Sequence, residues 1–284
     1  MDSRQESVAF WATILGTLTG LFGVIQSFTW MALVGLLVIV GSIGALFYAH
    51  RQRQLVKSVD LAINGRSLDS LGMANLRRRL NRRLAIQEVR NLAVIDGPDL
   101  TLTWHCTGYC RAESEAAIEF SIDADTNVPF DELACSAYDL RRDPQKRHPI
   151  RPILVGPDGI SKKIAVPFLS PLEHQEPFSV LLTCRLPGCM QLGIDYYTAT
   201  LSFGQDRVPR YEVRLTFLNG PPEWVRVYER RVGLTIQLLK DLRPLREGAD
   251  ASEYVDAGRD VPATSVRIYV FSRGPCNRHS VEGP

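Results

Sequence analysis

The sequence predicts a transmembrane hairpin of two helices, followed by an all-β domain built as an antiparallel immunoglobulin-like β-sandwich. Two long apolar runs, from Val8 to Ile25 and from Trp30 to Tyr48, predict the hairpin. From residue 91 onward, short runs rich in Val, Ile, Thr, Tyr and Phe alternate with Gly, Pro and Asp, which predicts strands joined by turns. A β-barrel is the alternative arrangement of the same strands.

The two apolar runs contain no Asp, Glu, Lys, Arg or His, and each is long enough to cross a hydrocarbon core of about 30 Å as a helix. Only residues 26–29 separate them, so the pair predicts a tight hairpin over residues 1–50. A cleaved signal peptide is one alternative, but the first residues lack its basic start. A hairpin buried in a globular core is the other alternative, and apolar runs of this length are rare there.

Basic residues predict the orientation of the hairpin, because Lys and Arg near the membrane favour the cytoplasmic side. The connection 26–29 contains none, whereas Arg51, Arg53 and Lys57 follow the second run. We therefore expect a two-pass protein of the inner membrane with both termini in the cytoplasm. The runs contain no charged residue that would mark an ion path, which disfavours a transporter.

Small residues recur inside the two runs at a spacing that permits close helix packing. Gly16 and Gly20 form a GxxxG pair, and Gly41 and Ala45 form a similar pair in the second run. Either these residues close the hairpin on itself, or one pair also joins neighbouring protomers. The second interpretation predicts a homo-oligomer.

Residues 51–90 predict a basic amphipathic linker helix. This segment contains ten Lys or Arg against three Asp or Glu, a net charge of +7, although the whole chain of 284 residues carries only +2. Met73, Leu76, Leu80 and Leu84 recur near helical spacing between the arginines. Contact with anionic lipid headgroups is the first interpretation. A helix that packs its leucines on the next domain is the second, and nucleic-acid binding is the least supported. The residues expected at the lipid are Arg51, Arg53, Lys57, Arg77, Arg78, Arg79, Arg82 and Arg83.

The β-rich domain is expected over residues 91–273, followed by a disordered tail over 274–284. Strands are predicted at 99–105, 115–122, 132–140, 150–155, 161–167, 178–184, 196–203, 210–218, 224–229 and 265–272. The run before the alternating stretch YTATLSF resembles the tyrosine corner of immunoglobulin-like sandwiches, with Tyr196 or Tyr197 in that role. Leucines at residues 230–246 predict a helix, and the acidic, Gly- and Ala-rich residues 247–263 predict a surface loop.

Six cysteines are the strongest candidates for chemistry. Cys106 with Cys110 and Cys184 with Cys189 form two turn-like pairs, but neither has the spacing of a zinc knuckle. We therefore expect free thiols at strand ends, with disulfides and a zinc site as alternatives. The chain contains no G-x-S-x-G, H-E-x-x-H, P-loop or G-x-G-x-x-G motif, so we expect a protein that is not an enzyme and needs no cofactor.

The order of hairpin, basic linker and β-rich domain resembles that of prokaryotic two-transmembrane, β-rich effectors of defence systems. The resemblance covers the layout of the chain and no motif. It implies a β domain that recognises a ligand, such as a small nucleotide, or a protein partner, and a hairpin that oligomerises in the membrane. A passive scaffold that tethers a partner at the membrane, and a membrane-bound enzyme with an unrecognised site, are the alternatives.

Overall fold

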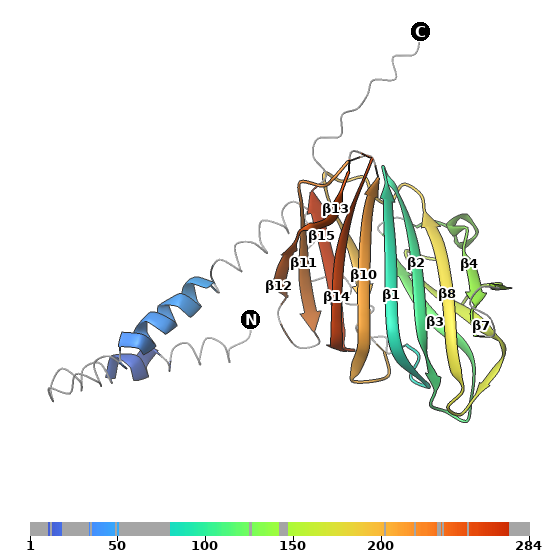
Figure 1. Cartoon of the computed structure of the whole chain (residues 1–284), viewed down its shortest axis with the longest axis horizontal. Helices are drawn as coiled ribbons and strands as arrows, with labels where there is room; N and C mark the ends of the chain where they lie inside the picture. Colours follow the sequence, from blue (N-terminus) through green and yellow to red (C-terminus); the bar gives the residue numbers. More distant parts are fainter. Residues whose placement is uncertain are drawn as a thin grey trace, which may run out of the picture. The chain divides into compact units, whose positions relative to one another are not determined.

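The computed structural model describes residues 11, 13–18, 34, 36–48, 50, 80–124, 127–141, 147–201, 203–218, 220–231, 234, 236–248 and 250–272. The chain divides into two compact units, residues 1–61 and 62–284. The α-helical residues described belong to the first unit, and all the strands described belong to the second (Figure 1).

In the first unit, residues 13–18 and 36–48 are helical. Gly16 is buried, and a Cβ atom added to it would lie 3.1 Å from Cγ1 of Val38. The two helical stretches therefore contact each other at Gly16, where the absence of a side chain allows close approach.

The prediction of a membrane-spanning hairpin, and with it the inner-membrane location, is wrong. Within the part of the chain that the structure describes, no helix is both long enough and apolar enough to cross a bilayer. Apolar composition alone led to the prediction.

An eight-stranded sheet forms one layer of the second unit, in the order β13-β14-β10-β1-β2-β8-β4-β5 (Figure 1). Neighbouring strands are antiparallel except β1 and β10, which are parallel. The strands are β1 (Leu84–Asp96), β2 (Asp99–Cys110), β4 (Ser136–Asp139), β5 (His148–Ile150), β8 (Pro177–Leu186), β10 (Arg207–Leu218), β13 (Pro244–Glu247) and β14 (Ala251–Pro262).

Two smaller sheets complete the unit. One has the order β12-β11-β15-β9 and the other the order β3-β7-β6. Their strands are β3 (Ser114–Asp123), β6 (Ile153–Leu154), β7 (Ser161–Glu173), β9 (Ile194–Thr200), β11 (Trp224–Arg231), β12 (Gln237–Leu242) and β15 (Ser265–Ser272), and a short 3-10 helix, η1 (Phe130–Leu133), precedes β4.

Both smaller sheets cover the same face of the eight-stranded sheet. Trp104 on β2 and Phe217 on β10 pair with Asn91 and Ile95, which are alternate positions of β1 on one face. The Trp104 ring lies 6.1 Å from that of Phe120 on β3, and the Phe217 ring lies 4.9 Å from that of Phe271 on β15. The hydrophobic core therefore fills the space between the large sheet and the two smaller ones.

An immunoglobulin-like sandwich of two sheets is not the arrangement found, because the described strands form three sheets and one of them is eight strands wide. The barrel alternative is also wrong, since the order of each sheet begins and ends at different strands. The protein is nevertheless built mostly of strands in its described part, as the turn-punctuated sequence indicates.

Four strands lie where the sequence predicted something else. Residues 84–90, expected as the end of the linker helix, form the first half of β1. The expected helix 230–246 contains β12 and most of β13, and the expected surface loop 247–263 contains β14.

Candidate functional site

A cleft lies between β3 and β9, which are edge strands of the two smaller sheets. Its floor is the inner face of the large sheet, where β1 contributes Val89 and Asn91 and β2 contributes Leu102, Trp104 and Cys106. The cleft has a cavity volume of about 90 Å³. The site thus occupies the gap that two separate sheets leave when they share one supporting sheet.

The floor of the cleft is apolar and aromatic, with one polar exception. Asn91 is only 4% exposed, and its Oδ1 atom is buried without a hydrogen-bond partner. The Asn91 side chain is hydrogen-bonded to the Tyr197 hydroxyl, an interaction that lowers the pKa of Tyr197, but burial outweighs it and raises that pKa overall. Because an unsatisfied buried acceptor costs about 1–3 kcal/mol, this oxygen is a ready partner for a donor that enters the cleft.

The charged residues in the described lining of the cleft are all acidic. Among the described residues that line it, Glu119, Asp123 and Asp195 are acidic, and none is Lys, Arg or His. Glu119 is also paired with Lys163, at 2.6 Å. Asp195 accepts backbone N–H bonds from Leu192 and Tyr196, at 3.2 and 2.9 Å. The lining therefore favours a ligand with donors or positive charge and disfavours an anion.

The cleft floor also contains a thiol that burial keeps protonated. Cys106 is fully buried on β2, and desolvation raises its pKa to about 12. Since the thiolate is the nucleophilic form of cysteine, this side chain contributes apolar surface rather than reactivity.

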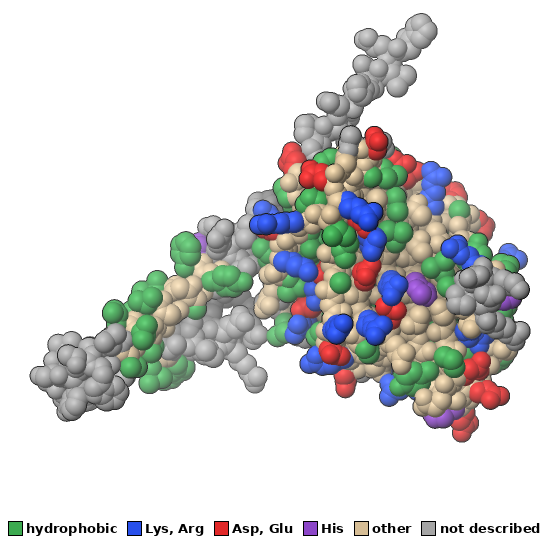
Figure 2. Space-filling model, viewed as in Figure 1, with side chains coloured by type: hydrophobic (Ala, Val, Ile, Leu, Met, Phe, Trp, Pro, Cys, Tyr) green, Lys and Arg blue, Asp and Glu red, His purple; other side chains and the backbone are tan. Residues whose placement is uncertain are grey.

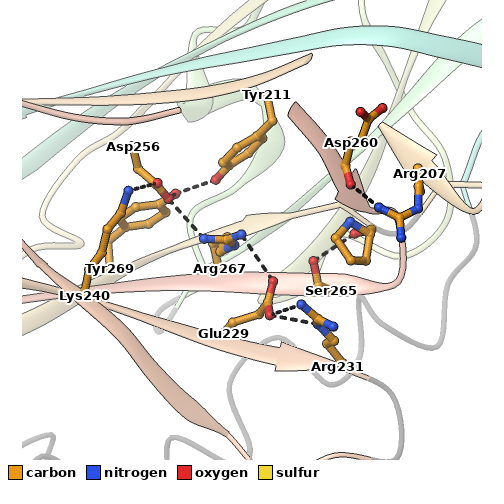
Figure 3. A network of polar contacts seen from close by, with 11 residues as sticks. Arg207, Tyr211, Glu229, Arg231, Lys240, Asp256, Asp260, Ser265, Arg267 and Tyr269 are labelled. Carbon is orange, nitrogen blue, oxygen red and sulfur yellow. Dashed lines mark hydrogen bonds and ion pairs between the residues drawn. The ribbon is translucent and has the colours of Figure 1, made fainter. Parts of the chain in front are cut away.

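A buried polar network adjoins the cleft between the large sheet and the four-stranded sheet (Figure 3). Tyr197 stacks on Tyr269, with ring centroids 5.9 Å apart, and the Tyr269 hydroxyl donates to Asp256 at 2.7 Å. The hydroxyls of Tyr211 and Tyr269 are also hydrogen-bonded to each other. Asp256 further pairs with Lys240 at 2.7 Å and with Arg267 at 3.6 Å.

The same network extends outward through Arg267 to Glu229 and Arg231. Arg267 lies 3.3 Å from Glu229, which in turn lies 2.7 Å from Arg231 (Figure 3). The carboxylates of Asp256 and Glu229 are 3% and 5% exposed, so their charges depend on these cations for compensation. We interpret the network as a structural clamp that joins the two sheets beside the cleft.

The tyrosines of this network predict a loss of stability at alkaline pH. Burial raises the pKa of Tyr211 and of Tyr269 well above the ordinary value of 10.0. Both side chains therefore contribute stability that is fully present below about pH 10 and is lost as the pH rises toward their folded pKa. We expect the free energy of unfolding, measured by denaturant titration, to fall steadily above that pH. In the Tyr211→Phe/Tyr269→Phe variant this slope should be shallower, and an equally steep slope would contradict the assignment.

The opposite, outer face of the large sheet is polar, and charges of both signs are scattered over the surface of the second unit (Figure 2). There His105 Nε2 lies 2.9 Å from Ser179 Oγ. Burial, and secondarily Arg90, lowers the pKa of His105, so the imidazole is neutral near pH 7. Sequence analysis missed this pair because the two residues lie 74 positions apart.

The structure separates the cysteines that the sequence paired. Cys184 forms a disulfide with Cys135, which precedes β4, so the expectation of a free thiol at Cys184 is wrong. The neighbouring register pair, Ser136 with Thr183, brings these two cysteines opposite each other across β4 and β8. Cys106 and Cys110 are free thiols. The described residues contain no group of three or more side chains suited to hold a metal ion.

The other predicted site residues are widely dispersed. Gly41 and Ala45 are exposed helical residues, while Gly20 lies outside the described residues. Arg82 and Arg83 are exposed just before β1, and Arg83 lies 3.7 Å from Glu115. The remaining basic residues expected at the lipid, Arg51, Arg53, Lys57, Arg77, Arg78 and Arg79, also lie outside the described residues.

The predicted tyrosine corner lies at the cleft. Tyr196 and Tyr197 both line it, and Tyr197 is the buried one of the two. Asn91, the most informative residue of the floor, gave no signal in the sequence, because its burial depends on the pairing of β1 with β2 and β10.

No family model and no curated protein matches the sequence. Among solved structures, the chain is similar to the M1 zinc metallopeptidase from Deinococcus radiodurans, with a TM-score of 0.42, 15% identity, and coverage of 68% of this chain and 43% of that one. A mutant of a two-domain M1 zinc metallopeptidase bound to L-tryptophan gives a TM-score of 0.41, 14% identity, and coverage of 68% and 44%. This chain therefore spans less than half of their length, and at these TM-scores the likeness supports no inference of fold or activity.

Proposed function

We propose that the β-rich unit is a binding module, and that its cleft takes an apolar ligand with hydrogen-bond donors and no negative charge. The observation that carries this proposal is the Oδ1 atom of Asn91, a buried acceptor without a partner in the floor of an apolar cleft. Donation by a ligand to this atom removes the cost of leaving it unpaired. Trp104 and Phe120 supply the aromatic surface for the apolar part.

The charges of the residues that line the cleft determine which class of ligand it favours. Phosphate groups are bound by Arg, Lys or backbone N–H groups at helix N-termini. The described lining offers three carboxylates and no basic side chain, so a small nucleotide is a poor match for this cleft. A neutral or cationic amphiphile matches both the floor and the rim.

Two alternatives remain distinct from this proposal. A passive scaffold needs no cleft that binds a ligand, and an enzyme needs a reactive group near the bound molecule. Cys106 is the thiol at the floor, and its pKa of about 12 argues against a nucleophilic role. Binding without turnover is therefore the function that the cleft supports best.

Two dyes with one aromatic skeleton test the proposal on the full-length protein. Phenylnaphthylamine is neutral and carries one N–H donor, and anilinonaphthalenesulfonate is the same molecule with a negative sulfonate. We expect saturable binding of the neutral dye, detected as an increase in its fluorescence, and weaker binding of the sulfonated one. Equal or stronger binding of the sulfonated dye would contradict the proposed charge preference.

Asn91→Leu is the variant that isolates the acceptor. Loss of one hydrogen bond worth about 1.4 kcal/mol should weaken binding of the neutral dye about tenfold. The free energy of unfolding should change little, because two effects oppose each other. The substitution removes the unpaired Oδ1 atom, which stabilises the fold, and it removes the hydrogen bond to Tyr197, which destabilises it. The matched control is Thr103→Val, a polar-to-apolar change on the outer face of β2, where Thr103 contacts Thr183 at 3.0 Å. Wild-type affinity in Asn91→Leu would exclude the acceptor role.

A further inference from the structure

Two arginines stand opposite each other on the outer face of the large sheet, the face away from the cleft. Arg210 on β10 is paired in register with Arg259 on β14, and both side chains are exposed. Arg210 lies an odd number of positions from the inward-facing Phe217, so its side chain and that of its register partner point outward. Figure 2 shows basic side chains on this face over β14, β10 and β1.

The nearest carboxylates are already engaged by other arginines. Glu88, the register partner of Arg210 on β1, accepts from Arg90 at 3.0 and 2.8 Å. Glu212, two positions along β10, lies 3.1 Å from Arg214. These ion pairs use the negative charge beside the two opposed arginines.

The two opposed arginines therefore carry positive charge that the described part of the chain does not compensate. Neither Arg210 nor Arg259 forms an ion pair or a side-chain hydrogen bond with another described residue. Residues directly opposite in an antiparallel pair have Cβ atoms about 4.5–5.5 Å apart, and like charges there destabilise the sheet. An anion held between the two guanidinium groups would remove this repulsion.

A hollow in the surface gives such an anion space beside the pair. It has a cavity volume of about 540 Å³, and both arginines line it. Ala257 and Gly258, which precede Arg259 on β14, also line the hollow. Their small size keeps the space next to the guanidinium groups open.

We propose that Arg210 and Arg259 bind the phosphate group of a small anionic ligand in this hollow. A guanidinium group presents its N–H donors as a planar fork that matches phosphate oxygens, and two forks on neighbouring strands reach one phosphate from two sides. The site is independent of the proposed function, because it lies on the other face of the sheet and takes the class of ligand that the cleft disfavours.

Isothermal titration calorimetry of the full-length protein with inorganic phosphate, at constant ionic strength set with KCl, tests the site. We expect saturable binding by the wild type and about tenfold weaker binding by Arg210→Gln and by Arg259→Gln, since each loses one charge-assisted fork. Arg246→Gln is the matched control, because it removes an exposed arginine of the same sheet and should retain the wild-type affinity. Absence of saturable binding by the wild type, or equal weakening in all three variants, would overturn the inference.

A titration with phenyl phosphate distinguishes two sources of the phosphate group. Tighter binding than that of inorganic phosphate assigns the site to an organic monoester, and equal affinity assigns it to the free ion. Phenylnaphthylamine should bind Arg210→Gln as it binds the wild type, so failure of this site and failure of the cleft are separate results.

Thermal unfolding in chloride buffer without phosphate tests the repulsion between the two arginines. Arg259→Gln should unfold at the same temperature as the wild type or at a higher one, because it removes one of two opposed like charges. A lower unfolding temperature would show that contacts within the protein stabilise the pair, and it would overturn the inference.

Discussion

Replacing Asp256 by Ala is expected to lower the free energy of unfolding by about 3–5 kcal/mol, because it removes one partner from a buried charge network. Asp256 is 3% exposed and compensates Lys240 and Arg267. Its loss removes the carboxylate that pairs with Lys240, leaves Arg267 with Glu229 alone, and removes the carboxylate acceptor of the Tyr269 hydroxyl. Denaturant unfolding followed by circular dichroism measures the effect.

Asp241→Ala is the matched control for this prediction. Asp241 on β12 also pairs with an arginine, Arg226, at 3.3 Å, but its side chain is 70% exposed. Removing an exposed pair costs at most about 1 kcal/mol. If the two variants lose similar amounts of stability, the network does not clamp the sheets, and its residues are merely close together.

Reduction of the Cys135–Cys184 disulfide is the second large effect, with an expected loss of about 2–4 kcal/mol of unfolding free energy. The bridge closes a loop across 49 residues that includes β4, β5, β6 and β7. Reduction therefore increases the conformational entropy of the unfolded chain, which favours unfolding. Thermal unfolding with and without a reducing agent measures the change, and thiol titration of the denatured protein should find two fewer thiols before reduction than after it.

A cysteine variant separates the bridge from general effects of the reducing agent. In Cys135→Ser, unfolding should already be destabilised and should no longer respond to reduction. In Cys189→Ser, which leaves the bridge intact, the response to reduction should remain as in the wild type. A wild-type protein that titrates with all six of its thiols without reduction would show that the bridge does not form.

The sequence predicts those strands well whose side chains alternate between the core and the solvent. The ranges predicted at 99–105, 178–184, 210–218 and 265–272 lie within β2, β8, β10 and β15. Alternation is a local signal, and turn residues mark where each strand ends. The positions of these strands could therefore be predicted without knowing which strands they pair with.

The strands that were missed carry competing local signals. The basic run before β1 has leucines at helical spacing, and Leu84 belongs equally to that pattern and to the strand. β14 contains Ala, Gly and several acidic residues, a composition typical of loops, yet it is paired along its length with β10. In both strands, pairing with neighbouring strands outweighs the local preference of the residues for a helix or a loop. The sequence alone therefore does not predict these strands.

The candidate site was largely beyond sequence analysis. It contains no motif, and its residues come from β1, β2, β3 and β9, which only the sheet topology brings together. The acidic lining was equally hidden, because Glu119 and Asp195 are far apart in the chain.

The parallel pairing of β1 with β10 has a consequence for synthesis on the ribosome. Val89 pairs with Tyr211, so β1 is synthesised about 120 residues before the strand with which it pairs. At 5–20 residues per second, this delay lasts roughly 6–25 s. During that time one edge of β1 exposes unpaired backbone groups to other chains. The nascent protein is therefore most vulnerable to aggregation, and most dependent on chaperones, before β10 has left the exit tunnel.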